Sequence, residues 1–121
     1  MNPLDAYVKN SVETSSPLEQ IILLYDRAII ALKAAKEDIE NKNLQSKIEN
    51  ITKAQDIIRA LNSALDFERG GEIAQNLHML YDFVDRSLFT VHAKNDISLL
   101  EDLIDILENL KEGWEGIRSK V

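Results

Sequence analysis

The longest regular apolar pattern in the chain lies between Pro17 and Glu40, and it restricts the possible folds more than any other feature. Apolar side chains recur there at alternating steps of four and three, interrupted only by Lys36; they are Leu18, Ile22, Tyr25, Ile29, Leu32 and Ile39. That spacing places them on one face of an α-helix. Ser16 before the proline, with Glu19 at the third helical position, is a typical helix start. The sequence therefore predicts a long helix that packs against other helices.

Three further segments show the same helical spacing of apolar residues. We expect helices over about 44–68, over about 72–94 and from residue 97 onward. Gly70-Gly71 is expected to end the second of the four helices in a left-handed conformation, and Asn95-Asp96 to separate the last two. No stretch alternates with a period of two, so we expect no strands. Short connections between four long helices favour an all-α, antiparallel up-down-up-down four-helix bundle.

The N-terminal segment differs from these helices in length and polarity. It is polar but carries four apolar side chains on one helical edge: Leu4, Tyr7, Val8 and Val12. One or two helical turns are too short to be stable alone, so this edge must dock on something or remain loose. A chain of 121 residues makes one ordinary domain. We therefore expect a short helical flap over residues 1–15 and a single bundle domain over residues 16–121.

Charge and composition argue against several classes of partner. The chain has 21 acidic and 14 basic residues, a net charge of −7, which repels the phosphate backbone of nucleic acids. It has no cysteine, so neither a disulfide nor a thiolate metal site is possible. No apolar run reaches the roughly 18 residues of a membrane span, and we see no export leader. We expect a cytoplasmic protein that does not insert into membranes.

No group of residues matches a catalytic or metal-binding pattern. His78 and His92 fall on one helix and lack the preceding glutamates of a di-iron bundle, so we interpret them as boundary or surface residues. Gly70-Gly71 is a turn signal rather than a phosphate-binding loop. We therefore expect no enzymatic activity, no catalytic residue, no metal, no cofactor and no small-molecule substrate.

Six apolar side chains lie away from the core stripes of their helices on a helical wheel. They are Leu23 and Ile30 in the first helix, Met79 and Phe83 in the third, and Leu103 and Ile106 in the fourth. Because a bundle needs only one apolar face per helix, we interpret these residues as contacts with another polypeptide that is helical in form. For the third and fourth helices a second interpretation stays open, namely that the core is simply wide.

Several short motifs, taken in order, resemble the FliS family of flagellar proteins. They are Asn2-Pro3, Ala6-Tyr7, the stretch 11–17, Leu23-Leu24-Tyr25-Asp26, the stretch 67–74, Leu80-Tyr81-Asp82-Phe83 and Asn95-Asp96. The likeness covers nearly the whole chain, so it is more specific than any single motif. One departure is Arg27, where the family usually has glycine.

The resemblance implies an export chaperone that binds the disordered C-terminal segment of flagellin one-to-one. Such a chaperone prevents premature polymerisation and helps to deliver flagellin to the flagellar type III export gate. The resemblance also implies that the N-terminal flap covers part of the binding surface when the chaperone is empty, and that Leu4 and Tyr7 dock on a component of the gate. The alternative is a structural or signalling bundle that self-associates and has no flagellin client.

Overall fold

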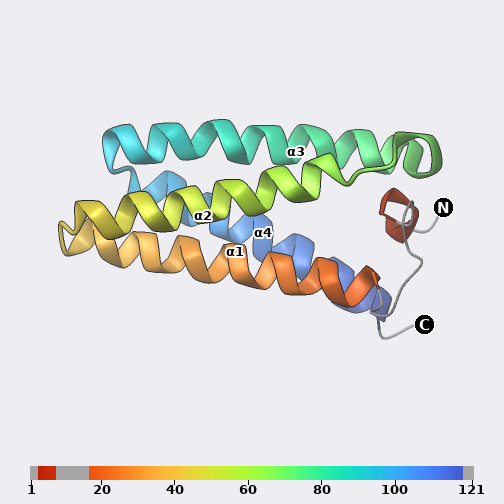
Figure 1. The fold of residues 1–121 in the computed structure, drawn as a ribbon, viewed down its shortest axis with the longest axis horizontal. Helices are drawn as coiled ribbons and strands as arrows, with labels where there is room; N and C mark the ends of the chain where they lie inside the picture. The colour runs from red at the N-terminus through yellow and green to blue at the C-terminus, as the bar shows by residue number, and fades with distance from the viewer. Residues whose placement is uncertain (1–2, 8–16, 119–121) are drawn as a thin grey trace.

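The computed structural model describes residues 3–7 and 17–118, which form four long α-helices and one short 3-10 helix. The elements are η1 (Pro3–Ala6), α1 (Pro17–Glu40), α2 (Leu44–Ser63), α3 (Phe67–Lys94) and α4 (Ile97–Arg118). Figure 1 shows that the long helices run antiparallel, up-down-up-down. The described residues contain no strand. The predicted four-helix bundle is therefore confirmed. The predicted helix start at Ser16, and Val8 and Val12 of the N-terminal apolar edge, lie outside the described residues.

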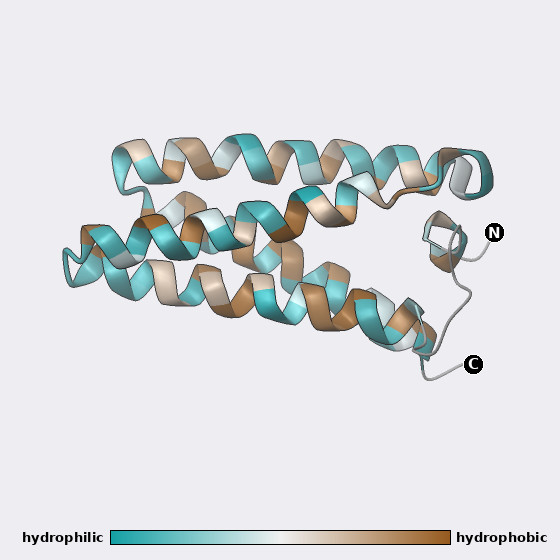
Figure 2. Ribbon diagram, in the orientation of Figure 1, coloured by the Kyte–Doolittle hydropathy of each residue, from teal (hydrophilic) through white to brown (hydrophobic). Residues whose placement is uncertain are grey.

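The core is made by the apolar faces of the four long helices. Hydrophobic residues recur along every helix in Figure 2. The largest fully buried side chains include Tyr25, Leu32, Ile58, Tyr81, Leu88 and Leu107, which come from all four helices. α1 packs against α2 and α4, whereas α3 packs against α2 and less closely against α4. The α3–α4 side is therefore the most open side of the bundle.

The boundary between α2 and α3 lies earlier than the sequence predicts. α2 ends at Ser63 and α3 begins at Phe67, whereas the sequence predicts a boundary at 68–72. The reason is Asp66, whose carboxylate accepts hydrogen bonds from the backbone N–H groups two and three residues later, at 3.1 and 3.0 Å. These bonds satisfy the free N–H groups of a helix start. Gly71 does have a positive φ of 50°, but it forms a kink inside α3.

A buried lysine ties the start of α2 to the end of α3. Lys47 is 5% exposed, and its Nζ donates hydrogen bonds to the backbone oxygen of His92 (3.1 Å) and to Oδ1 of Asn95 (2.7 Å). Asn95 adopts the left-handed conformation that ends α3. Asp96 then accepts a hydrogen bond from the backbone N–H of Leu99 and begins α4. The predicted break at Asn95-Asp96 is confirmed.

Candidate functional site

Four of the six predicted contact residues have exposed side chains. The exposed fraction is 47% for Leu23, 60% for Ile30, 66% for Met79 and 44% for Phe83. The first two lie on α1 and the last two on α3. These four side chains are therefore available to a partner.

Met79 and Phe83 lie on the flank of α3 that faces away from α2. The opposite flank carries His78, which is bonded to Asn62 of α2 at 2.8 Å, and Asp85, which pairs with Arg59 of α2 at 3.2 Å. Since successive residues of a helix are turned by about 100°, positions 79 and 83 fall away from these contacts. Both apolar side chains therefore border the open α3–α4 side of the bundle.

The expectation that Leu103 lies on an exposed second face of α4 is wrong. Leu103 is completely buried, and Ile106 is partly buried against the core. The physical reason is that α4 has helical neighbours on two sides, α1 and α3, so its buried arc is wide. For these two residues the wider core is the better interpretation. Only Ile106 retains surface that a partner can reach.

The structure adds exposed apolar residues that sequence reasoning missed. Ile48 of α2 is 40% exposed, and Phe89 of α3 is 55% exposed. Both line a cavity of about 180 Å³ between α2 and α3. Ile48 also lines a groove of about 550 Å³ between α1 and α2, together with Leu24 and Ile57. The exposure of Phe89 could have been predicted from the sequence, because this residue lies roughly 140° around the helix from the core residue Val84.

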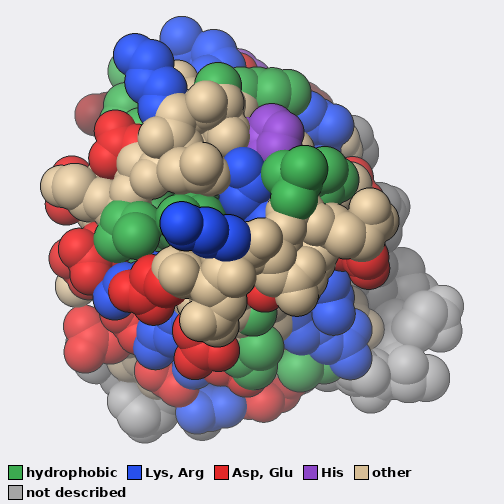
Figure 3. Space-filling view, turned by 90° about the vertical axis from the view of Figure 1, so that its left-hand side faces the viewer, with side chains coloured by type: hydrophobic (Ala, Val, Ile, Leu, Met, Phe, Trp, Pro, Cys, Tyr) green, Lys and Arg blue, Asp and Glu red, His purple; other side chains and the backbone are tan. Residues whose placement is uncertain are grey.

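The end of the bundle that carries the α1–α2 and α3–α4 turns is also partly apolar. Leu44 is 61% exposed there and lines a small cavity with Ile39 and Lys47. Figure 3 looks onto this end and shows hydrophobic side chains reaching the surface in separate groups among charged ones. At this end the apolar side chains therefore do not form one patch.

At the opposite end, η1 is docked on the start of α3 (Figure 1). Ala6 is fully buried and Tyr7 is 9% exposed, while Leu4 is partly buried against the core. The backbone N–H of Asp66 donates a hydrogen bond to the backbone oxygen of Ala6 at 2.8 Å. A Cβ atom at Gly70 would lie only 2.7 Å from the Cα atom of Ala6. Glycine at position 70 is therefore what allows η1 to dock.

The docked segment completes a buried network of tyrosine hydroxyls. The Tyr7 hydroxyl donates to that of Tyr81 at 2.6 Å, and the hydroxyls of Tyr25 and Tyr81 are hydrogen-bonded at 2.5 Å. The ring of Tyr7 also meets that of Trp114 edge-on, with 5.7 Å between centroids. Burial raises the pKa of all three tyrosines above the ordinary value of 10.0, most strongly for Tyr7 and Tyr81. The network is therefore stable only with its phenols protonated.

This network predicts a loss of stability in alkali. Above pH 10 the unfolded chain releases phenol protons that the folded chain keeps, so the free energy of unfolding falls as pH rises. The slope is about 1.4 kcal/mol per pH unit for each tyrosine that stays protonated in the folded chain. Because these are the only three tyrosines in the chain, tyrosinate absorbance measures the network directly. We expect that absorbance to appear together with unfolding; ionisation of all three in a fully helical protein would contradict the structure.

Replacing Gly70 with alanine should displace η1 from its docked position. The new methyl group would meet Ala6 Cα at 2.7 Å and Ala74 Cβ at 2.8 Å, so one side must move. We expect a loss of about 1–3 kcal/mol in stability, faster hydrogen exchange at the Asp66 amide, and altered fluorescence of Trp114. The matched control is Gly113→Ala in α4, where nothing lies within 4 Å of the added Cβ. That change should stabilise by about 0.5–1 kcal/mol; equal behaviour of the two variants would refute the docking of η1.

No group of three or more His, Cys, Asp or Glu side chains in the described part of the chain is placed to hold a metal ion. None of the described helices combines the length and apolar character needed to cross a membrane.

Comparison with known proteins gives one consistent match. The family model described as "Flagellar protein FliS" matches residues 1–121. Over 120 residues the chain is 33% identical to the "Flagellar secretion chaperone FliS" of Bacillus subtilis, covering 98% of this chain and 89% of the relative. The protein of the same name in Vibrio cholerae is 38% identical over 118 residues, with 94% and 87% covered.

A solved structure supports the fold independently. The chain resembles a structure described as "Crystal structure of flagellar chaperone from bacteria" with a TM-score of 0.83, covering 95% of this chain and 94% of that one. The sequence identity is 23%, so this likeness concerns the bundle alone.

Proposed function

The chain belongs to the FliS family of flagellar proteins, and we propose that it binds the disordered C-terminal segment of flagellin in the cytoplasm. Its relatives are named flagellar secretion chaperones, so its role is that of a chaperone in flagellar export. This is a chaperone family and not an enzyme family. On this proposal the chain binds flagellin one-to-one and keeps the segment from polymerising before export.

The observation that supports this proposal best is the distribution of exposed apolar side chains. Eight large apolar side chains among the described residues are 40% exposed or more, and they come from α1, α2 and α3. Ordering a disordered client opposes binding by about 2–5 kcal/mol, so such interfaces are large, about 1,000–3,000 Å². A bundle of this size offers that area only to a client that wraps around it. Contact points on three helices suit such a client.

We propose specific contacts for the wrapped segment. Five of the contacts inferred from the sequence keep exposed surface: Leu23, Ile30, Met79, Phe83 and Ile106. Ile48 and Phe89, which the structure adds, extend the proposed path of the client across the α2–α3 side. Their burial against apolar client side chains is the expected source of affinity.

The N-terminal residues suggest how binding of flagellin could be linked to docking on the export gate. Leu4 and Tyr7 are proposed to dock on a component of the export gate, yet both are turned into the bundle when η1 is docked. They become available only if η1 leaves α3. Displacement of η1 by the client would therefore link flagellin binding to delivery at the gate.

Inhibition of filament growth tests the proposed function. Seeded flagellin elongation, followed by light scattering, should stop when one equivalent of this chain is present. Chain that has first been saturated with the isolated C-terminal segment should no longer inhibit, because its surface is occupied. Unchanged elongation at equimolar chain would rule out the proposed activity.

A further inference from the structure

A small cavity at the end of the bundle seen in Figure 3 has the opposite charge to the chain as a whole. Its volume is about 180 Å³. The residues that line it are Asp38, Ile39, Lys42, Asn43, Leu44, Lys47 and Asn95. Two lysines and one aspartate give it a local charge of +1, in a chain with a net charge of −7. The carboxylate of Asp38 already accepts a hydrogen bond from Nδ2 of Asn50 at 2.7 Å. The cavity therefore favours an anion in a protein whose net charge repels anions.

Lys47 of this cavity is a buried cation without a carboxylate partner. Its ammonium group has three protons, and two of them are donated to uncharged oxygens, the backbone oxygen of His92 and Oδ1 of Asn95. It forms no ion pair with the described residues. Buried charges are normally paired, because removing a charge from water is unfavourable. One proton and the charge of Lys47 are therefore available to a ligand in the cavity.

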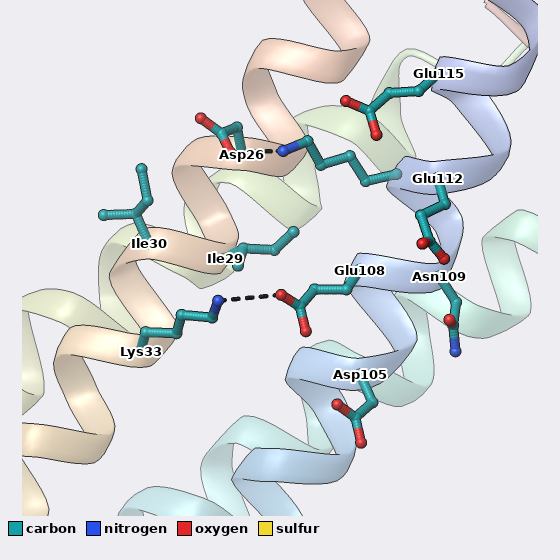
Figure 4. Close-up of a pocket in the computed structure, with 10 residues that line it drawn as sticks. Asp26, Ile29, Ile30, Lys33, Asp105, Glu108, Asn109, Glu112 and Glu115 are labelled. Carbon is teal, nitrogen blue, oxygen red and sulfur yellow. Dashed lines mark hydrogen bonds and ion pairs between the residues drawn. The ribbon is translucent and has the colours of Figure 1, made fainter.

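The lysines between α1 and α4 differ from Lys47 in this respect. Nζ of Lys33 lies 3.0 Å from a carboxylate oxygen of Glu108, and Nζ of Lys111 lies 2.8 Å from one of Asp26. These two ion pairs are the dashed lines in Figure 4. Both lysine side chains are more exposed than that of Lys47, at 57% and 25% against 5%. The more deeply buried cation is therefore the one that lacks a counter-ion.

The residues that line the cavity carry further hydrogen-bond donors. Oδ1 of Asn95 accepts from Lys47, and Oδ1 of Asn43 accepts from the backbone N–H of Ser46 at 3.2 Å. The Nδ2 groups of both asparagines have no acceptor among the described residues. Leu44 is the first residue of α2, so the positive end of the helix dipole also lies here. An ammonium, two amides and a helix N-terminus together suit a carboxylate.

The other walls of the cavity are apolar. Ile39 is partly buried against the core, and Leu44 is 61% exposed. Since a cavity of about 150 Å³ holds benzene, this one has room for a single residue. Leu44 also lies one helical turn before Ile48, which the proposed path of the client crosses. The cavity therefore adjoins that path and fits one residue that carries both a carboxylate and hydrocarbon.

We propose that this cavity binds the C-terminal α-carboxylate of flagellin. The inference rests on the proposed function, in which the client is the C-terminal segment of flagellin and so ends in a free carboxylate. That carboxylate accepts hydrogen bonds from Nζ of Lys47 and from the asparagine amides, while the hydrocarbon of the last residue lies on Ile39 and Leu44. A free inorganic anion would leave these apolar walls uncovered. The chaperone thus recognises the end of its client as well as its apolar side chains.

Calorimetry with two forms of the isolated flagellin segment tests this inference. One form ends in the natural carboxylate, and the other is identical but ends in a carboxamide. We expect the acid to bind at least about tenfold more tightly, because the amide cannot make charge-assisted hydrogen bonds to Lys47. The net charge of the chain alone would favour the amide, so the sign of the difference is diagnostic. Equal affinities would overturn the inference and leave the proposed function standing, whereas failure of both forms to bind would contradict both.

Two variants locate the preference in the cavity. Lys47→Gln removes the cation and should reduce the affinity for the acid to that for the amide. Because Lys47 also joins α2 to α3, Leu44→Glu serves as a second variant. Position 44 is exposed, and a glutamate in the first turn suits a helix, but its charge repels the carboxylate. This variant should also abolish the preference.

The matched control is Ala60→Glu, which adds the same charge at an exposed position of α2. It lies sixteen residues from position 44, about 24 Å along the helix. We expect this variant to keep the roughly tenfold preference for the acid. A preference that survives in Leu44→Glu, or that disappears equally in Ala60→Glu, would show that the carboxylate does not bind in this cavity.

Discussion

Replacing Leu103 with aspartate should abolish folding of the bundle. The Leu103 side chain is completely buried among the core residues of α4. The change removes about 1.5–3 kcal/mol of apolar burial and places a carboxylate where no partner awaits it, at a further cost of several kcal/mol. The sum is comparable with the whole stability of a domain, about 5–15 kcal/mol. We expect far-ultraviolet circular dichroism to show loss of helix at room temperature.

The matched control is Ile30→Asp, the same kind of change at a side chain that is 60% exposed. It should alter the free energy of unfolding by only about 0.5 kcal/mol, as is usual for surface positions. Helical, cooperatively melting Leu103→Asp protein would mean that α4 does not pack as described. The two variants therefore distinguish the buried Leu103 from the exposed Ile30, both of which the sequence analysis predicted to contact another polypeptide.

A double substitution of Met79 and Phe83 by aspartate should have the largest effect on client binding. Both side chains are exposed on α3, so their replacement leaves the core intact. If the client buries them, their loss removes about 1.5 kcal/mol or more for each side chain. The expected result is roughly 100-fold weaker binding of the flagellin segment with unchanged helicity.

The control for that variant adds the same charge without removing apolar surface. Gln75→Asp combined with Asn76→Asp changes two exposed polar positions on the same helix. We expect its affinity for the flagellin segment to stay within about threefold of the wild-type value. Similar weakening in both double variants would show that charge repulsion, rather than apolar contact, governs this surface.

The sequence predicted the elements that depend on local signals. The bounds of α1 agree with the prediction because Pro17 marks the start and the polar residues 41–43 interrupt the apolar pattern. The α2–α3 boundary was misplaced because a Gly-Gly pair in a sequence indicates a helix end more strongly than a single aspartate indicates a helix start. In the structure Asp66 caps α3, and Gly70 instead allows the close approach of Ala6.

Features that depend on packing were less accessible from the sequence. A helical wheel gives the direction of Leu103 but not the width of the buried arc, which α4 acquires from neighbours on two sides. The hydroxyl network joins Tyr81 to Tyr7 and Tyr25, which lie 74 and 56 residues away in the sequence. No local sequence pattern predicts contacts between residues so far apart. In contrast, Leu23, Ile30, Met79 and Phe83 were correctly expected to be exposed, because each lies clear of a well-defined stripe.

Titration calorimetry can test whether flagellin's C-terminal segment folds around this bundle, as we propose. The isolated segment from the host's flagellin would be titrated into the chain at several temperatures. We expect one-to-one binding with a large negative change in heat capacity, which indicates extensive apolar burial. No heat and no co-elution, with the chain instead forming a tight homodimer that covers its exposed apolar residues, would contradict it and favour the self-associating bundle.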